Sequence, residues 1–364
     1  MRRCSVQSAV ALQTSSKIDF FTDIAAMRQK EHAMTQVIRW GILGTGKIAK
    51  AFATALQDTP DAKLVAVASR TVDSANKFGA EYGAERFHGS YQALADDPEV
   101  DVIYIGTPHP MHHENALMCL NGGKAVLVEK SFTMNRRQAE DIINLARKKK
   151  LFVMEAMWTR FMPAIVEAKR IVDSGEIGKP ANVTADFGFT AVMDREGRLF
   201  NPELGGGALL DLGIYPLSMS SFFLGPVTAV KAQAEMADTG VDMQTAFTLT
   251  HKDGGVSSCA CSLRSRTPTQ LTISGEKGFV RLHDRFHNTE TITVTLVDGS
   301  SRSERTLNLP RSGNGYTHEA QEVGRCIRAG LIESPVMPHD ETLALMGTLD
   351  AIRSQIGLRY SADN

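Results

Sequence analysis

The sequence is short of cysteine, of tryptophan and of any strong excess of one charge. Its 364 residues include five cysteines and two tryptophans, and 40 Lys and Arg face 41 Asp and Glu, for a formal net charge of −1. Neither sign of charge gathers into a long block, so we expect no nucleic-acid partner and no membrane partner. No uninterrupted apolar run approaches the roughly 20 residues of a membrane-spanning helix.

The cysteines are odd in number and scattered, and the one close pair, Cys259 and Cys261, would point to opposite faces of a strand, so a reduced, cytoplasmic protein without a metal site is expected. The N-terminal segment MRRCSVQSAVALQTSS has two arginines. Its apolar patch is shorter than the roughly 7 to 15 residues of a secretion signal, and no small-residue cleavage site follows. We therefore expect residues 1–34 to be a disordered or start-site extension, because the first patterned strand begins after Met34.

The length of the chain suggests two domains, since single cores rarely grow past about 250 to 300 residues. From Val37 to about Met154, short β-branched runs alternate five times with helix-like segments, which predicts a doubly wound parallel sheet over residues 35–156. After Trp158 come a helix, a glycine-rich segment and several runs of alternating polarity joined by short turns. These predict an α/β domain with a large, mainly antiparallel open sheet over residues 157–364.

A glycine motif lies between the first expected strand and the first expected helix. WGILGTGKIAKAF places Gly44, Gly46 and Ala49 in the G-x-G-x-x-A spacing. Gly44 permits a tight turn, Gly46 lets backbone approach a pyrophosphate, and the helix N-terminus offers unpaired N–H groups. The motif predicts a Rossmann dinucleotide-binding site that includes Gly44, Thr45, Gly46, Lys47 and Ile48.

The end of the second expected strand bears on the choice between NAD and NADP. It reads Ala68-Ser69-Arg70-Thr71 and lacks the acid that would accept the ribose 2′-hydroxyl of NAD. A guanidinium and two hydroxyls suit a 2′-phosphate, so Ser69, Arg70 and Thr71 favour NADP, while NAD stays possible. The alternative is that Arg70 is an ordinary solvated loop cation.

A lysine ends the expected strand in KAVLVEKSFTMN. Ligands of open α/β sheets bind outside the carboxyl ends of the strands, where Lys130 could stabilise an alkoxide or lower the pKa of a tyrosine. It could equally be a surface cation. Asp211 and Tyr215 lie four residues apart and would share one face of a helix, but the pattern alone does not show that this face meets Lys130.

Five segments in order resemble the glucose-fructose oxidoreductase and inositol dehydrogenase family. They are GILGTGKIA, YIGTPHPMHHENA, VLVEKSFTMN, MEAMWTRFMPA and GGALLDLGIYPL, and the resemblance runs from about Val37 to near Gly357. It implies a Rossmann domain followed by an α/β domain whose open sheet commonly builds dimers or tetramers. The most similar members oxidise trans-dihydrodiols and D-xylose.

The resemblance also implies roles for individual residues. It makes Lys130, Asp211 and Tyr215 catalytic, with Tyr215 as the acid/base that many sugar-oxidising relatives replace by histidine. Further cofactor contacts are implied for Thr107, Pro108, His109, His112, Glu129, Lys130, Trp158 and Arg160. Substrate contacts are implied for Phe187, Trp158, Asp211 and Tyr215. Ser131 stands where relatives have a proline, so the means of holding Lys130 is an open question.

These inferences predict an NADP-dependent oxidoreductase that transfers hydride between nicotinamide and a cyclic polyol, such as D-xylose or a trans-dihydrodiol. One alternative is an inositol dehydrogenase or anhydro-sugar reductase of the same family, and Tyr215 in place of histidine argues modestly against the inositol group. The other is a non-catalytic cofactor-sensing regulator, against which the retained lysine and tyrosine argue. We expect a homodimer or homotetramer that assembles through the C-terminal sheet.

Overall fold

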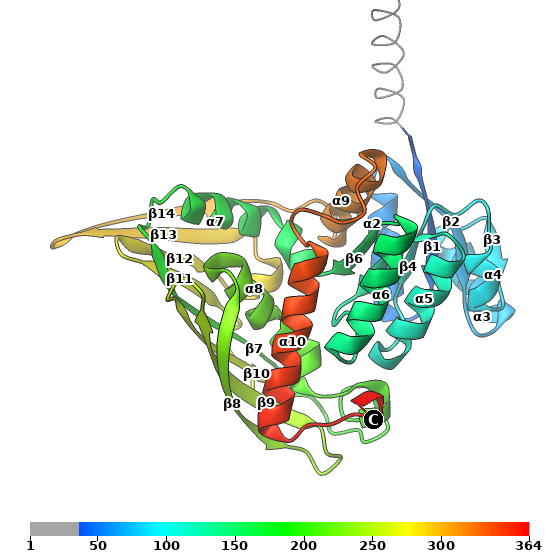
Figure 1. The fold of residues 1–364 in the computed structure, drawn as a ribbon. Coiled ribbons are helices and arrows are strands. Elements are labelled where there is room, and N and C mark those ends of the chain that lie inside the picture. The colour runs from blue at the N-terminus through cyan, green and yellow to red at the C-terminus, as the bar shows by residue number, and fades with distance from the viewer. Residues whose placement is uncertain (1–35, 364) are drawn as a thin grey trace, which may run out of the picture.

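A computed structural model of the chain describes residues 36–363 and contains two sheets that lie side by side (Figure 1). The expectation for residues 1–34 therefore lies outside the described residues. The first sheet has six strands in the order β3-β2-β1-β4-β5-β6, and the second has eight in the order β14-β13-β12-β11-β7-β10-β9-β8. The predicted fold class, a Rossmann sheet followed by a large open sheet, is confirmed.

All strand pairs of the first sheet are parallel. The strands are β1 (Ile38–Leu43), β2 (Ala62–Ala68), β3 (Arg86–His88), β4 (Val102–Ile105), β5 (Ala125–Glu129) and β6 (Val153–Ala156). The helices around them are α2 (Lys47–Gln57), α3 (Val72–Tyr82), α4 (Tyr91–Ala95), α5 (His112–Asn121) and α6 (Arg136–Lys149). Every residue of β4 and β5 is buried, as in strands covered on both faces. The chain progresses in opposite directions from β1 and β4, which places a ligand crevice at their carboxyl ends.

The second sheet is antiparallel except where β7 pairs with β10. Its strands are β7 (Pro180–Gly188), β8 (Val227–Met236), β9 (Asp242–His251), β10 (Val256–Ser262), β11 (Leu271–Gly275), β12 (Gly278–Leu282), β13 (Thr291–Asp298) and β14 (Ser301–Asn308). Three of the strands, β3, β7 and β14, are not predicted by the sequence patterns. β3 has three residues and β14 is exposed along nearly all its length, so neither shows apolar alternation, and β7 begins with a proline.

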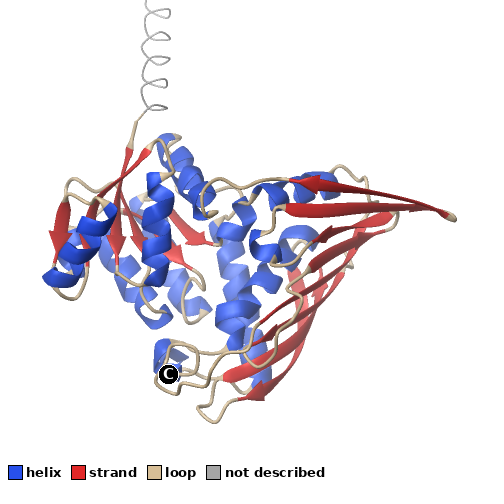
Figure 2. Cartoon of the chain, turned by 180° about the vertical axis from the view of Figure 1, so that it is seen from behind, coloured by secondary structure: helices blue, strands red, loops and turns tan. Residues whose placement is uncertain are grey.

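Helices cover one face of the second sheet, on the side of the first sheet (Figure 1). They are α7 (Pro163–Asp173), α8 (Ile214–Leu224) and α10 (His339–Ile356), whereas α9 (Tyr316–Arg328) packs on α2. Short helical turns are η1 (His109–Met111), η2 (Trp158–Phe161), η3 (Pro202–Leu204), η4 (Leu209–Gly213), η5 (Phe286–Asn288) and η6 (Ser361–Asp363), of which η4 is a single π-helical turn. Figure 2 shows that, within the described residues, no helix covers the opposite face.

One apolar stretch is longer than the sequence patterns indicate. Pro202–Leu224 spans 23 residues, and its most apolar window has a mean hydropathy of 1.3, enough by length and composition to cross a membrane. However, 94% of that window is buried inside the protein, between the two sheets. The stretch is therefore a central segment of the protein core. It runs from η3 to α8 and carries Asp211 and Tyr215.

Candidate active site

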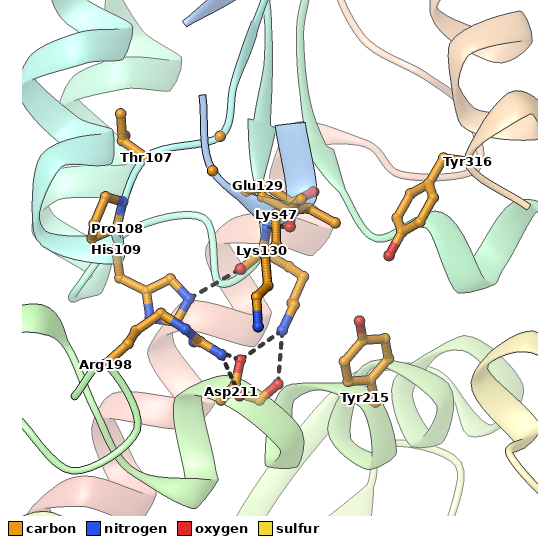
Figure 3. A pocket seen from close by; sticks show the side chains of 13 residues that line it. Lys47, Thr107, Pro108, His109, Glu129, Lys130, Arg198, Asp211, Tyr215 and Tyr316 are labelled. Atoms are coloured by element: carbon orange, nitrogen blue, oxygen red, sulfur yellow. Dashed lines mark hydrogen bonds and ion pairs between the residues drawn. The ribbon is translucent and has the colours of Figure 1, made fainter. Parts of the chain in front are cut away.

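A cavity of about 550 Å³ opens at the carboxyl ends of β1, β4 and β5, where they face α8 (Figure 3). Residues from α2, from the ends of β4 and β5, from the irregular segment after β7, from η4 and α8, and from α9 line it. The lining comprises Gly46, Lys47, Ile48, Gly106, Thr107, Pro108, His109, Glu129, Lys130, Arg198, Asp211, Tyr215 and Tyr316. Segments far apart in the sequence therefore meet at the crevice that the parallel sheet predicts.

The glycine motif forms a cradle at one end of the cavity. Gly44 has φ +99°, and an added Cβ would lie 3.3 Å from the carbonyl oxygen of Gly106, so the turn requires glycine here. Gly46 is the N-cap of α2 and has no side-chain cap, while an added Cβ at Gly46 would meet nothing within 4 Å. An uncapped helix N-terminus beside open space fits a bound pyrophosphate.

The end of β2 lies next to this cradle. The hydroxyl oxygens of Thr45 and Ser69 are 3.3 Å apart, which joins the glycine loop to the strand end. Thr71 is the N-cap of α3, and its hydroxyl accepts a hydrogen bond from the backbone N–H of Ser74 at 3.3 Å. The side chain of Arg70 is exposed beside them. Of the three residues predicted to bind a 2′-phosphate, Ser69 and Thr71 thus have hydrogen-bonding partners within the protein.

Two buried histidines fasten the segment that follows β5. His109 places Nε2 3.1 Å from the carbonyl oxygen of Lys130, and His112 places Nδ1 3.1 Å from that of Ser131 and Nε2 2.8 Å from that of Thr107. Burial lowers the pKa of both rings, that of His109 to about 3, so His109 is neutral at pH 7 and donates from one nitrogen only. The Ser131 hydroxyl donates to the carbonyl of Leu210 at 2.9 Å, and the Lys130–Ser131 peptide bond is cis.

Lys130 reaches across the cavity to the helix that carries Asp211. Its Nζ donates to the backbone oxygen of Asp211 at 2.8 Å and to Oδ1 at 3.1 Å (Figure 3). The same ammonium lies 5.0 Å from the centre of the Tyr215 ring. The structure thus brings together the three residues predicted to be catalytic, which the sequence pattern alone could not establish.

Asp211 is held by a second cation, Arg198. The guanidinium Nη1 and Nη2 atoms lie 3.1 Å from Oδ1 and 3.1 Å from Oδ2. Burial alone would raise the pKa of this carboxyl, but Lys130 and Arg198 outweigh burial and hold the pKa well below its usual value. Asp211 is therefore ionised throughout the neutral range.

Tyr215 is buried, and its hydroxyl oxygen accepts a hydrogen bond from the indole Nε1 of Trp158 at 3.0 Å. Burial raises the pKa of Tyr215 well above its usual value, and the bond from Trp158 offsets part of this rise. The expectation that Lys130 lowers this pKa is not met here, because Lys130 is bound to Asp211 and lies over the ring rather than at the hydroxyl. Tyr215 is thus a neutral phenol with its own proton available to donate.

Aromatic rings form the wall behind Tyr215. Phe187 stacks on His287 with ring centres 4.5 Å apart, and both rings pack against Tyr215. Trp158 stacks on Tyr316 at 4.5 Å, and the hydroxyls of Tyr316 and Tyr215 point toward one another in Figure 3. The cavity therefore offers polar groups on the Lys130 side and flat rings on the other.

Not every predicted residue reaches the cavity. Arg160 is buried with its guanidinium donating to Ser218 and Glu341, so it joins α8 to α10 instead of facing a cofactor. Glu129 lines the cavity, but one of its carboxylate oxygens accepts a hydrogen bond from Tyr104 at 2.6 Å. The other predicted residues outside the lining lie around the cavity: Gly44, Thr45, Ser69, Arg70, Thr71, His112, Trp158 and Phe187.

Three side chains of the site were absent from the sequence prediction: those of Arg198, His287 and Tyr316. Arg198 follows β7 in an irregular segment, His287 belongs to the turn η5, and Tyr316 begins α9. None belongs to a motif, and their chemistry becomes visible only when the fold brings them to Asp211, Phe187 and Trp158.

Comparisons with known proteins agree with this geometry. Residues 38–157 match the oxidoreductase family with an NAD-binding Rossmann fold, and residues 165–281 match the GFO/IDH/MocA C-terminal domain. Trans-1,2-dihydrobenzene-1,2-diol dehydrogenase of Danio rerio is 36% identical over 334 residues, covering 90% of this chain and 99% of that protein. The Homo sapiens protein of the same name is 33% identical over 335 residues, with the same coverage.

Two solved structures show the same fold. Aldose-aldose oxidoreductase from Caulobacter crescentus, complexed with glycerol, has a TM-score of 0.79 and 25% identity, covering 88% of this chain and 97% of that one. A 3-ketoreductase from Actinomadura kijaniata, in complex with NADP and TDP-benzene, has a TM-score of 0.77 and 25% identity, covering 88% and 98%.

Proposed function

The chain belongs to the GFO/IDH/MocA family of nicotinamide-dependent oxidoreductases, as its motifs predicted, and we propose that it is an NADP-dependent dehydrogenase of cyclic polyols. The substrate is an aldopyranose such as D-xylose or a trans-dihydrodiol. The observation that carries the proposal is the meeting of Lys130, Asp211 and Tyr215 in one cavity with the dinucleotide cradle. The name shared by the similar curated proteins supports a diol on a ring.

The cradle residues would hold the cofactor. The N–H groups of Lys47 and Ile48 at the start of α2 would bind the pyrophosphate, and the exposed Arg70 would bind the 2′-phosphate. The loop from Thr107 to His109 lies on the path from this cradle to Lys130 and would support the nicotinamide end. When bound, the nicotinamide ring supplies the hydride acceptor.

The polar side of the cavity carries out the proton transfer to and from the substrate hydroxyl. During carbonyl reduction the neutral Tyr215 gives its phenolic proton to the substrate oxygen. During oxidation Tyr215 first releases that proton to solvent, and the resulting phenolate oxygen takes the substrate hydroxyl proton. The N–H of Trp158 stabilises this oxygen while it is without its proton. Lys130, held by Asp211, places a positive charge beside the substrate oxygen and favours its alkoxide form.

A substrate panel tests the proposal directly. Pentoses, hexoses, inositols and trans-dihydrodiols are each assayed with NADP and with NAD by the absorbance of the reduced nicotinamide. The proposal requires turnover of a pyranose or a dihydrodiol with NADP as the better cofactor. Turnover of inositols alone would indicate an inositol dehydrogenase instead. Binding of NADPH without turnover of any cyclic polyol would indicate a non-catalytic regulator.

We further propose that two chains associate through the uncovered face of the second sheet. Thr184, Ser258 and Thr248 lie in register across β7, β10 and β9 and are exposed on this face. These three side chains are small and uncharged, which allows a second sheet to approach closely. Light scattering should show that the wild-type protein is a dimer or a larger oligomer and that the Ser258→Arg variant is a monomer. A wild-type protein that is a monomer at about 10 µM would contradict this proposal.

A further inference from the structure

Arg198 is a charged residue of the cavity whose role no motif explains. It extends from the irregular segment between β7 and η3, and both of its terminal nitrogens contact the carboxylate of Asp211 at 3.1 Å. Half of its side chain is exposed, whereas only 10% of the Asp211 side chain and 13% of that of Lys130 are exposed. Arg198 therefore covers the solvent side of the Lys130–Asp211 pair.

The donors around Asp211 leave little room for a substrate. Oδ1 accepts from both Lys130 Nζ and Arg198 Nη1, at 3.1 Å each, and Oδ2 accepts from Arg198 Nη2. A carboxylate oxygen accepts about two hydrogen bonds, so Oδ1 is full and Oδ2 has one position left. Asp211 can thus receive at most one substrate hydroxyl, and its main partners are the two cations.

We propose that Arg198 is a positioning residue that acts through Asp211 to fix the ammonium of Lys130 beside the reacting oxygen. This inference rests on the proposed function. The forked contact fixes the plane of the Asp211 carboxylate, and a fixed plane sets where Oδ1 holds Lys130. Without Arg198 the carboxylate rotates about its side-chain torsion, and Lys130 keeps only its bond to the backbone oxygen of Asp211.

The rival explanation is that Arg198 merely anchors its own segment. That segment has other attachments: Phe200 is buried, and the backbone N–H of Gly207 donates to the carbonyl of Leu199 at 2.9 Å. Arg195, on the same segment, offers a matched control because its side chain is 64% exposed and pairs with Asp238 at the surface. If Arg198 only anchored the segment, replacing Arg198 or Arg195 by alanine would change the stability of the protein and leave kcat unchanged.

The test compares Arg198→Ala, Arg198→Lys and Arg195→Ala. Displacement of a catalytic group by about 1 Å costs about 100-fold in rate, so kcat of Arg198→Ala should fall about 10- to 100-fold while KM for NADP changes less than about threefold. Because Arg198 is half exposed, guanidinium ion can reach the vacated site and should restore several-fold of the lost kcat in Arg198→Ala. Arg195→Ala should keep wild-type kcat and show no response, and Arg198→Lys should fall between the two.

A crystal structure of Arg198→Ala gives a readout that needs no substrate: the Lys130 Nζ should leave Asp211 Oδ1 or become disordered. If wild-type enzyme turns over no cyclic polyol, the proposed function fails while this structural readout still tests the positioning role. An unchanged Lys130–Asp211 contact, an unchanged kcat with a lower Tm, or a loss of kcat that guanidinium does not relieve would each overturn the proposal.

Discussion

The indole N–H of Trp158 donates to the hydroxyl oxygen of Tyr215 at 3.0 Å and so joins η2, which follows the parallel sheet, to α8, which packs under the open sheet. The bond uses a lone pair of the phenol and leaves its proton available to the cavity. It is also the interaction that lowers the pKa of Tyr215 against the larger effect of burial. The two halves of the protein thus meet at the hydroxyl group that we propose as the proton-transfer group.

Replacement of Tyr215 by phenylalanine should reduce kcat by about 10²- to 10⁴-fold, the usual contribution of a positioned acid/base. Lys130→Met should cause a loss in the same range, because no other ammonium contacts Asp211 Oδ1 within the described residues. Both variants should bind NADPH with near-wild-type affinity by fluorescence titration. Tyr82→Phe, on the remote helix α3, is the control and should leave both kcat and the affinity for NADPH unchanged. Near-wild-type turnover in either site variant would end the proposed mechanism.

Alanine should have a different effect at each of the two glycines of the cradle. Gly44→Ala should weaken folding, and Gly46→Ala should weaken cofactor binding. Gly44 has φ +99°, so Gly44→Ala should lower stability by about 1 kcal/mol or more, visible in Tm without any cofactor. Gly46 has φ −76° and open space where a Cβ would lie, so Gly46→Ala should leave Tm unchanged. Its methyl group should instead block the pyrophosphate and raise KM for NADP about tenfold or more. Equal KM values in Gly46→Ala and wild type would place the dinucleotide elsewhere.

Arg70→Ala should remove the preference for NADP. A hydrogen bond to a charged group contributes about 1.5 to 3 kcal/mol, so kcat/KM for NADP should fall about 10- to 100-fold while that for NAD changes little. Lys77→Ala, an exposed cation on α3, is the matched control for a general loss of positive charge. If Arg70→Ala affects both cofactors equally, or neither, Arg70 is the solvated loop cation that the sequence left as the alternative.

Local patterns made much of the fold predictable. The glycine motif, the apolar strands and the strand-end position of Lys130 are readable from a few consecutive residues, and the structure has them where they were expected. Strands without apolar alternation were not predicted: β3 is too short to show it, and β14 is polar and exposed. The open sheet was still recognised because its longer strands, such as β9, alternate buried and exposed residues.

The site was harder, because its contacts join residues far apart in sequence. Lys130 and Asp211 are 81 residues apart, and nothing local shows that they meet. Sequence neighbours can also separate: in the turn η2, Trp158 faces Tyr215 while Arg160, two residues on, faces Ser218. Arg160 was grouped with the cofactor contacts through its place in MWTRF, and the turn directs it into the core instead.

A buried carboxyl beneath the site predicts a pH dependence of stability. Asp242, the first residue of β9, accepts hydrogen bonds from the Leu209 N–H at 2.8 Å and the Thr245 hydroxyl at 2.6 Å, while Oδ1 is buried without a partner. Burial raises the pKa of Asp242 to about 6, and the two hydrogen bonds oppose this rise. The folded protein therefore binds this proton more tightly than the unfolded chain, whose carboxyl titrates near 3.9.

The sign of the effect follows from linkage: a raised folded pKa gives stability that is complete below about pH 4 and is lost as pH rises through about 6. A shift of about two units corresponds to about 3 kcal/mol, of which about 1 to 2 kcal/mol is lost between pH 5 and 8. Asp242→Asn has no charge to bury, so its free energy of unfolding in urea should improve relative to wild type by that amount from pH 5 to pH 8. Asp253→Asn, an exposed acid in the turn after β9, should run parallel to wild type. A wild-type curve parallel to that of Asp242→Asn would mean that Asp242 is already ionised in the folded protein at pH 5.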